Sequence, residues 1–307
     1  MSFTAPDDYQ VFYKMVYKRC IVYINLNYWD KITKYDLDVW LANFKNDEEK
    51  YLAALILNRL IYRNEKSILA MLSNIFFVEL PQYLKKNNIF TVNDLELFDK
   101  KLYIKAKNFK NVATFRFTTI TTGDLGESGH LYIKYLREYF VCNDLIIDIS
   151  SPTIERYVNT IVIIDDFIGS GKQLSEFIRN NESNLKRFKH IVFMPLIAHT
   201  IGISNVLEVA REKELSIDII PIEEISFENS FFYHNVEEDY LFDGYNKLTS
   251  LYAFYEELVE SKIDIKNNKF GVGKLGLTHV FSTGVPDNNL PIIYKSSVNW
   301  TALREKR

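Results

Sequence analysis

Residues 161–178 read IVIIDDFIGSGKQLSEFI, and this stretch decides both the fold and the candidate site. The four β-branched residues at 161–164 are typical of a strand buried on both faces of a parallel sheet. Two acids follow, Asp165 and Asp166, and then a glycine-rich turn and an amphipathic helix that begins near Gln173. The order predicts a strand, a tight turn and a helix.

This order also predicts two adjacent subsites. Ligands of open α/β sheets bind at the carboxyl ends of strands, where Asp165 and Asp166 fall. These carboxylates can accept hydrogen bonds from sugar hydroxyls or hold Mg²⁺ through water. Glycines let backbone N–H groups approach an anion, and the helix N-terminus adds its positive dipole end. The predicted phosphate loop is Gly169, Ser170, Gly171, Lys172 and Gln173.

The same residues resemble the phosphoribosyl diphosphate (PRPP) motif of type I phosphoribosyltransferases. The resemblance implies that Asp165 and Asp166 contact the ribose hydroxyls, with Mg²⁺ held indirectly, and that residues 170–173 hold the 5′-phosphate. Two positions depart from the motif, because the family usually has a small residue where Lys172 stands and Thr where Gln173 stands. These departures leave the substrate and the turnover open.

Two other interpretations of the stretch compete with this one. A P-loop would need glycine at position 166 and Ser or Thr at 173, but the chain has Asp166 and Gln173. The remaining alternative is a buried strand that ends in a solvated acid pair and an ordinary turn. Acids at a strand end followed by a glycine loop at a helix start favour the ligand site.

A second strand, loop and helix precede the first. Residues 113–120 alternate as a strand and lead through TTGDLGESGH into a helical stretch, where Ser128 can act as the N-cap. By their position in the family's order, the candidates for a pyrophosphate loop are Thr122, Gly123, Ser128 and Gly129. A structural cap without a ligand is the equal alternative. Nearby, a mild basic cluster favours a solvated face over charge neutralisation of a pyrophosphate; its members are Lys105, Lys107, Lys110 and Arg116.

Alternation of strands and helices continues to residue 220, which argues for a parallel sheet with right-handed crossovers. The expected class is α/β, a mostly parallel sheet flanked by helices, phosphoribosyltransferase-like, with an N-terminal helical subdomain and a C-terminal extension. We expect a helical subdomain over 1–105 and an α/β domain over 106–307. Residues 221–247 break the alternation and predict an inserted hood over one face.

Segments outside the motif resemble a phosphoribosyltransferase-like family found in bacterial anti-phage systems, including some retrons. They are WLANF at 40–44, the helices after it, and VPDNNLPII at 285–293 with Trp300 just beyond. The resemblance implies a defence role. From the residues alone, 36–84 predict a helical module that could dock a partner protein.

Composition limits the partners and the cellular compartment that we expect for this chain. The chain has 307 residues, 47% of them hydrophobic and 25% charged, with a net charge of −3. No basic excess favours direct nucleic-acid binding. The acidic start MSFTAPDDYQ is unlike a signal peptide, and no uninterrupted apolar segment approaches the ~20 residues of a membrane helix, so no membrane partner is expected. The two distant cysteines, Cys20 and Cys142, suit a reducing cytoplasm.

Three hypotheses remain open. The first is a protein that binds PRPP or a related ribose-phosphate nucleotide with Mg²⁺ and transfers or cleaves at the anomeric carbon. The second is a non-catalytic nucleotide-sensing module that regulates a partner. The third is a structural protein with a relic pocket. The acceptor, the partner's identity and any homo-oligomer are not specified by the sequence.

Overall fold

The computed structural model describes residues 2–90, 98, 100–102, 109–120, 128–141, 143–152, 154–233, 246–263 and 265–305. The chain forms two compact units. Unit 1 combines residues 1–65 with 226–307, and unit 2 is continuous over 66–225. This division differs from the boundary near residue 105 suggested by the sequence, because the last eighty or so residues pack with the N-terminal helices.

Unit 2 is built on a five-stranded, fully parallel sheet, which confirms the predicted α/β class. Its order is β2-β3-β4-β5. The last strand, β6, also pairs with β4, at residues 197–199, whereas β5 pairs with residues 191–193. The strands are β2 (Phe115–Thr119), β3 (Thr160–Ile168), β4 (His190–His199), β5 (Ile217–Ile219) and β6 (Glu223–Ile225).

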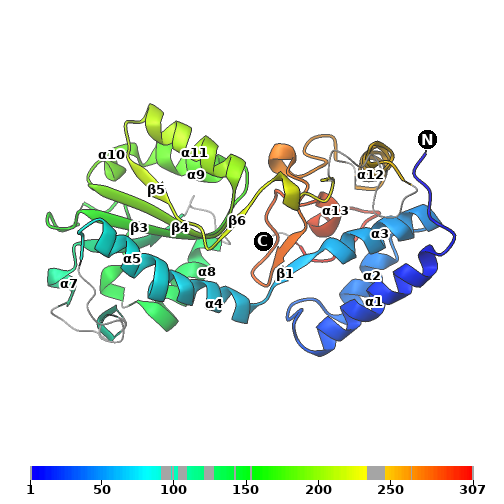
Figure 1. Ribbon diagram of the computed structural model, residues 1–307, viewed down its shortest axis with the longest axis horizontal. Helices are drawn as coiled ribbons and strands as arrows, with labels where there is room; N and C mark the ends of the chain where they lie inside the picture. The colour runs from blue at the N-terminus through cyan, green and yellow to red at the C-terminus, as the bar shows by residue number, and fades with distance from the viewer. Residues whose placement is uncertain are drawn as a thin grey trace. The chain divides into compact units, whose positions relative to one another are not determined.

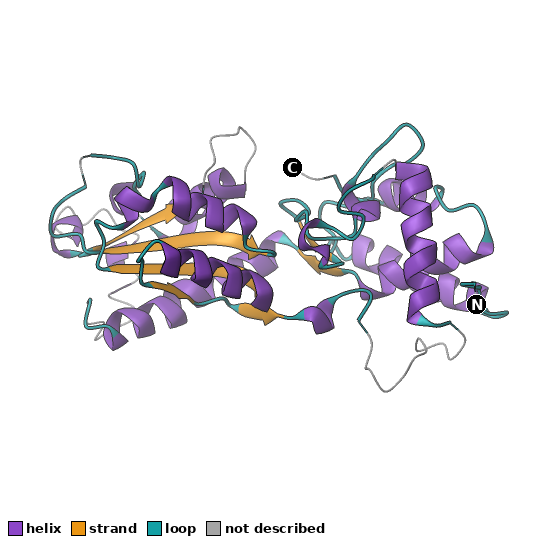
Figure 2. Cartoon of the chain, turned by 90° about the horizontal axis from the view of Figure 1, so that it is seen from above, coloured by secondary structure: helices purple, strands orange, loops and turns teal. Residues whose placement is uncertain are grey.

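Helices cover both faces of this sheet. On one face lie α9 (Lys172–Asn180), α10 (Glu182–Leu185) and α11 (Thr200–Glu212). The other face carries α4 (Glu65–Asn74), the π-helix η1 (Ile75–Glu79), α5 (Leu80–Lys86) and α8 (Ser128–Tyr135), which continues as the π-helix η2 (Leu136–Phe140) (Figure 1). Figure 2 shows helices lying over the strands from above. Ile161 and Ile163 of β3 are therefore fully buried.

The chain changes direction between β2 and β3. After β2 it passes through α8 and η2 to Ile146, whose isolated parallel bridge to Phe117 adds to the far side of β2. It then crosses back to pair β3 on the other side of β2. In open α/β sheets, ligands bind at such a reversal, in the crevice outside the carboxyl ends of the central strands. In place of a further strand, residues 143–149 contribute only this bridge, which the 3₁₀ turn η3 (Asn143–Leu145) precedes.

The helical run Glu65–Lys86 is apolar and packs on the sheet of unit 2. This run of 22 residues contains an apolar window with a mean hydropathy of 1.3, so by length and composition it could cross a membrane, the one such helix among the described residues. Yet 44% of its apolar window is buried, and the ring of Phe76 lies 5.5 Å from Phe117 of β2. Tyr83 donates a hydrogen bond of 2.8 Å to Asp218 of β5. These contacts are those of a helix covering a sheet.

Arg116 is not part of a solvated basic face. Its side chain is fully buried, and its guanidinium donates to the carbonyls of Ala113, Phe115 and Lys110. It also meets Glu155 at 3.3 Å. Burial acts to raise the pKa of Glu155, but the backbone N–H of Glu155, Lys110 and Arg116 together hold that pKa below its usual range. A buried guanidinium needs such partners, because an unpaired buried charge is strongly destabilising.

We predict a pH-dependent effect of Glu155→Gln. A depressed folded-state pKa contributes stability that is present above the unfolded value of about 4.3 and is lost as pH falls through the folded value. The variant should therefore lose about 1–2 kcal/mol of unfolding free energy at pH 7, the scale of a charged hydrogen bond. The difference from wild type should shrink toward zero below about pH 4. Urea denaturation across pH measures both, with exposed Glu208→Gln as the control; a difference independent of pH would contradict the ion pair.

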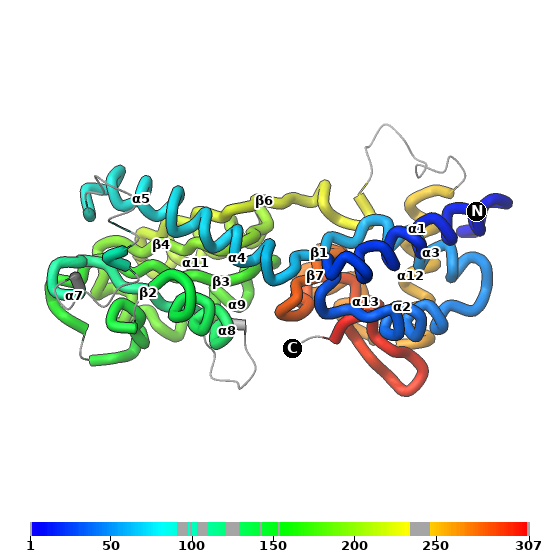
Figure 3. Tube along the Cα trace, turned by 90° about the horizontal axis from the view of Figure 1, so that it is seen from below, coloured from blue at the N-terminus to red at the C-terminus, as the bar shows by residue number. Residues whose placement is uncertain are grey.

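Unit 1 packs helices around a small parallel pair of strands, β1 (Ile61–Arg63) and β7 (His279–Phe281). Figure 3 traces its N-terminal and C-terminal parts in one body. Its helices are α1 (Tyr9–Asn25), α2 (Lys34–Leu41), α3 (Asp47–Arg59), α12 (Leu248–Ile263) and α13 (Pro291–Tyr294), with 3₁₀ turns at η4 (Phe227–Asn229) and η5 (Val272–Lys274).

The two outlying segments that carried the family resemblance meet in unit 1. The indoles of Trp40 and Trp300 both donate to the carbonyl of Ile292, at 2.9 and 3.1 Å. The ring of Phe44 lies edge-on between them, 4.8 Å from Trp40 and 5.1 Å from Trp300. Asn289, in the VPDNNLPII segment, accepts the N–H of His279 in β7. These residues, far apart in the sequence, therefore form one packed cluster in unit 1.

The predicted hood over 221–247 needs a correction at its start. Glu223–Ile225 forms β6 and extends the sheet beside β4, so the strand alternation does not stop at residue 220. The turn η4 follows in unit 1. Residues 234–245 lie outside the described part of the chain.

We predict that Trp40→Ala destabilises unit 1 by about 3–5 kcal/mol, the usual cost of truncating a large buried aromatic. Trp40 is fully buried and would also leave the carbonyl of Ile292 with one donor fewer. Thermal and urea unfolding measure the loss. Tyr35→Ala is the control in the same helix, since Tyr35 is 75% exposed and should change stability by less than about 0.5 kcal/mol. Equal effects of the two substitutions would contradict this packing.

Candidate functional site

Asp165 and Asp166 lie in β3, just past the end of its pairing with β2. The last β2–β3 pair is Thr119 with Ile164, whereas β3 stays paired with β4 as far as Ile168 and Ala198. One side of β3 is thus released from the sheet where the acids begin. The acids therefore stand at the reversal of strand order, where α/β sheets bind ligands.

The two carboxylates differ in their surroundings. Asp165 is 4% exposed, and its Oδ1 accepts the backbone N–H of Asp166 at 3.0 Å. Asp166 is partly exposed. The carboxylate of Asp165 is therefore held in the interior, not directed into bulk solvent from a convex surface, and Asp166 is the more accessible of the pair.

The predicted phosphate loop is a tight turn between β3 and α9. Gly171 has φ of 78° and occupies the N-cap position of α9 in the left-handed region, which glycine adopts without a steric cost. No side chain caps this helix start. A helix that begins on glycine presents backbone N–H groups to an anion, and the helix dipole favours negative charge there.

Helix α11 holds this turn from behind. A Cβ on Gly202 would stand 2.1 Å from the carbonyl oxygen of Gly169, and a Cβ on Gly171 would stand 2.6 Å from the carbonyl oxygen of Gly202. Asn205 donates from Nδ2 to the carbonyl of Ser170 at 3.0 Å. The backbones of turn and helix are therefore in direct contact, and this contact fixes the shape of the turn.

Lys172 and Gln173, the two positions that depart from the PRPP motif, are both exposed. The Lys172 side chain is 74% exposed, and its Nζ lies 4.0 Å from Glu176 one turn along α9. An exposed pair of this kind contributes little to stability. Lys172 is therefore available to a ligand at the turn.

The second predicted loop is described only at its end. Thr122 and Gly123 lie outside the described residues, as does the side chain of Ser128, so the predicted N-cap stays a prediction. Gly129 is buried in the first turn of α8, where a Cβ would stand 2.2 Å from the carbonyl oxygen of Ile120. Its own carbonyl accepts a hydrogen bond of 3.2 Å from Thr119 Oγ1. The start of α8 therefore abuts the end of β2, beside the acids.

Two histidines, His199 and His130, lie at the starts of helices α11 and α8. His199 ends β4 and is fully buried, and its Nδ1 accepts the backbone N–H of Ile201 at 3.1 Å, which caps α11. His130 is an exposed residue in the first turn of α8.

The acid pair fits an indirectly held Mg²⁺. Among the described residues, no cluster of three or more His, Cys, Asp or Glu side chains could enclose a metal ion. Mg²⁺ usually keeps several waters and binds proteins through one or two carboxylates together with substrate phosphates. Asp165 and Asp166 are a donor set of that kind.

Fold and site together define a phosphoribosyltransferase-like α/β domain. A family model described as PRTase-CE matches residues 37–306, and the chain therefore belongs to the PRTase-CE family. The match spans both units and includes every predicted site residue. Searches of curated proteins and of solved structures found no match.

Sequence reasoning missed Gly202 and Asn205, although both shape the predicted phosphate loop. A glycine inside a helical pattern is unfavourable by about 1 kcal/mol and therefore signals close packing when it is retained. Gly202 follows β4 by three residues, so the signal was present. Its partner in space could not be deduced, because α11 and the turn are thirty residues apart in the chain.

We predict that Gly202→Ala destabilises unit 2 by about 1–3 kcal/mol through overpacking against Gly169. The sign is informative, because the same substitution in an uncrowded helix gains about 1 kcal/mol. Urea denaturation measures the change, and hydrogen exchange should show faster exchange at residues 169–173. Exposed Ser204→Ala in the same helix is the control. A stabilising Gly202→Ala would disprove the close contact.

Proposed function

We propose that this protein binds PRPP or a related phosphorylated ribose, together with Mg²⁺, in the crevice beyond β2 and β3. The observation that carries the proposal is the buried Asp165 near the end of β3. A glycine turn follows this strand directly, and α11 holds that turn in a fixed shape. Membership of the PRTase-CE family supports the same ligand class.

Each part of the crevice has a role in this proposal. Asp165 and Asp166 accept hydrogen bonds from the ribose 2′- and 3′-hydroxyls and orient the ring. The backbone N–H groups of 170–173 bind the 5′-phosphate at the start of α9. Residues Thr122, Gly123, Ser128 and Gly129 would face the pyrophosphate. Bound Mg²⁺ would offset the negative charge of the pyrophosphate, held through water by the acid pair.

The reaction we propose is transfer or cleavage at the anomeric carbon. The bond from the anomeric carbon to the leaving group breaks, and the leaving group, pyrophosphate or a base, keeps the electron pair. A bond to an acceptor or to water forms at the same carbon, and the incoming group gives up a proton. The transition state is oxocarbenium-like, so the protein contributes by positioning and by electrostatics.

The biological setting we propose is an effector role in bacterial anti-phage defence. It rests on the resemblance of the WLANF and VPDNNLPII segments to proteins of such systems. The packing of Trp40 and Trp300 onto the carbonyl of Ile292 supports treating these segments as one packing unit. We expect the α/β unit to handle the nucleotide and residues 36–84 to offer a surface for a partner protein.

A second candidate is a nucleotide-sensing module without turnover that regulates a partner. The observation that favours it is the replacement of the usual small residue and Thr by exposed Lys172 and Gln173. These side chains would change how the 5′-phosphate end of the site is filled. Incubation with a nucleotide pool, followed by mass spectrometry, separates the candidates, because only the enzyme changes the pool.

We predict that Asp165→Asn with Asp166→Asn weakens PRPP binding by at least about tenfold, because two charged hydrogen bonds to the ribose are lost. Isothermal calorimetry with PRPP and Mg²⁺ measures the affinity. Glu208→Gln with Glu212→Gln removes the same charge from exposed positions of α11 and should bind like wild type. Unchanged affinity in the acid-pair variant, with circular dichroism like wild type, would refute the roles assigned to the acids.

A further inference from the structure

A groove runs along α8 and η2 in unit 2; none of its lining residues is a predicted ribose-phosphate residue, although His130 directly follows Gly129. It has a volume of about 370 Å³ and is lined by His130, Ile133, Lys134, Arg137 and Glu138. This volume falls within the range of small-molecule sites. Three of the five side chains carry N–H donors, and one is a carboxylate.

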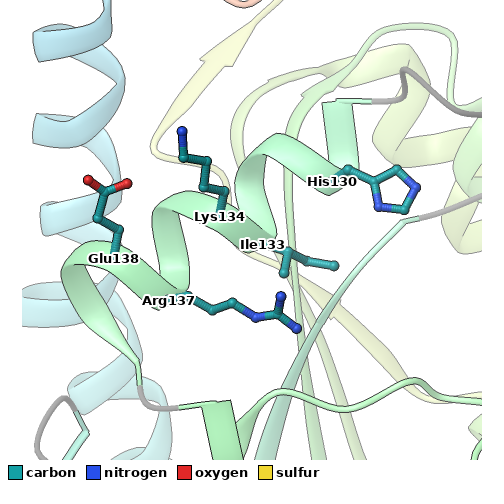
Figure 4. A pocket seen from close by; sticks show the side chains of 5 residues that line it. All are labelled: His130, Ile133, Lys134, Arg137 and Glu138. Carbon is teal, nitrogen blue, oxygen red and sulfur yellow. The ribbon is translucent and has the colours of Figure 1, made fainter.

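The side chains of the groove point in two directions (Figure 4). His130, Ile133 and Arg137 project to one side of the helix, with Ile133 between the two nitrogen-bearing groups, and Lys134 and Glu138 project to an adjoining side. Seven residues separate His130 from Arg137, which corresponds to about 10 Å along a helix. The groove thus offers nitrogen donors at two ends and an apolar side chain in the middle.

The positively charged side chains of the groove are exposed to solvent, and neither forms an ion pair with a carboxylate of the described residues. Lys134 and Arg137 are both exposed. The ion pairs found among the described residues involve neither of them. A guanidinium offers a planar fork of donors that matches phosphate oxygens, and the lysine ammonium adds a flexible point charge.

The backbone beneath the groove is unusual and firmly held. Arg137 and Glu138 belong to the π-helix η2, and single π-turns occur frequently at functional sites. The inner side of η2 is fixed by Phe140, whose ring stacks on Phe76 at 4.9 Å with an interplanar angle of 9°. Leu136 of the same turn is fully buried. Arg137 is therefore presented from a rigid support.

We propose that this groove is a second ligand site, which binds the oligophosphate chain of a small molecule. Arg137 and His130 bind the two ends of the chain, and Lys134 supplies a third donor from the adjoining side. The separation of about 10 Å selects several linked phosphates over a single one. Three donors on one helix, in a chain with net charge −3, do not make the extended basic surface that a nucleic acid requires.

A ligand in this groove would act on the ribose-phosphate site as an effector. Helix α8 carries the groove, and its first turn abuts the end of β2 through Gly129 and the carbonyl oxygen of Ile120. The two sites are therefore joined by one helix. The groove itself has no acid pair or glycine turn, so it binds the effector and leaves sugar chemistry to Asp165 and Asp166.

Isothermal calorimetry on the full chain tests the proposal with tripolyphosphate, ATP and inorganic phosphate as separate probes. Lys134→Ala with Arg137→Ala should weaken tripolyphosphate binding by at least about tenfold, because charged hydrogen bonds are lost. The matched control is Arg179→Ala with Arg211→Ala, which removes the same charge from exposed positions of α9 and α11 and should bind like wild type. Asp165→Asn with Asp166→Asn should retain tripolyphosphate binding while it loses PRPP.

Several results would overturn the second site. They are no tripolyphosphate binding by wild type at millimolar concentration, equal weakening in the control pair, loss of binding only in the acid-pair variant, or inorganic phosphate binding as tightly as tripolyphosphate. Tighter binding of ATP would support a nucleotide that also contacts Ile133, and equal binding would support a free oligophosphate. Failure of PRPP to bind would count against the proposed function alone.

Discussion

The contact between the turn at 169–171 and helix α11 is the constraint on which the candidate site depends. Gly202 allows the two backbones to touch, and Asn205 adds a hydrogen bond to the carbonyl of Ser170. Without that support, a turn that starts a helix on a left-handed glycine could adopt several other backbone conformations. With it, the N–H groups at the start of α9 are aimed before any ligand arrives, which reduces the entropy lost on binding.

A second constraint acts from the opposite face of the sheet. Gly129 brings the start of α8 against the end of β2, so the sheet edge that carries the acids lies between two helix N-termini, those of α8 and α9. Both contacts rely on glycine because a Cβ would overlap a carbonyl oxygen. The anion-binding potential of the edge therefore comes from backbone geometry as much as from charged side chains.

Sequence patterns predicted the parts of the molecule that depend on local physics. The buried run 161–164 lies in β3, and the helix predicted to begin near Gln173 is α9. Sequence patterns did not predict contacts between residues that are far apart in the chain. Arg116 looked like a solvated cation because its carbonyl partners and Glu155 are visible only in space. The turn between β3 and α9 was predicted in its place, but its contact with Gly202 was not, because nothing local links α11 to residue 169.

The two indoles that share the carbonyl of Ile292 have a consequence for biosynthesis. Unit 2 is continuous in sequence, so its sheet can complete while later residues are still being translated. Unit 1 cannot complete its packing during translation in the same way, because the carbonyl that Trp40 binds lies some 250 residues later in the chain. Until that moment its N-terminal helices expose apolar surface on the nascent chain.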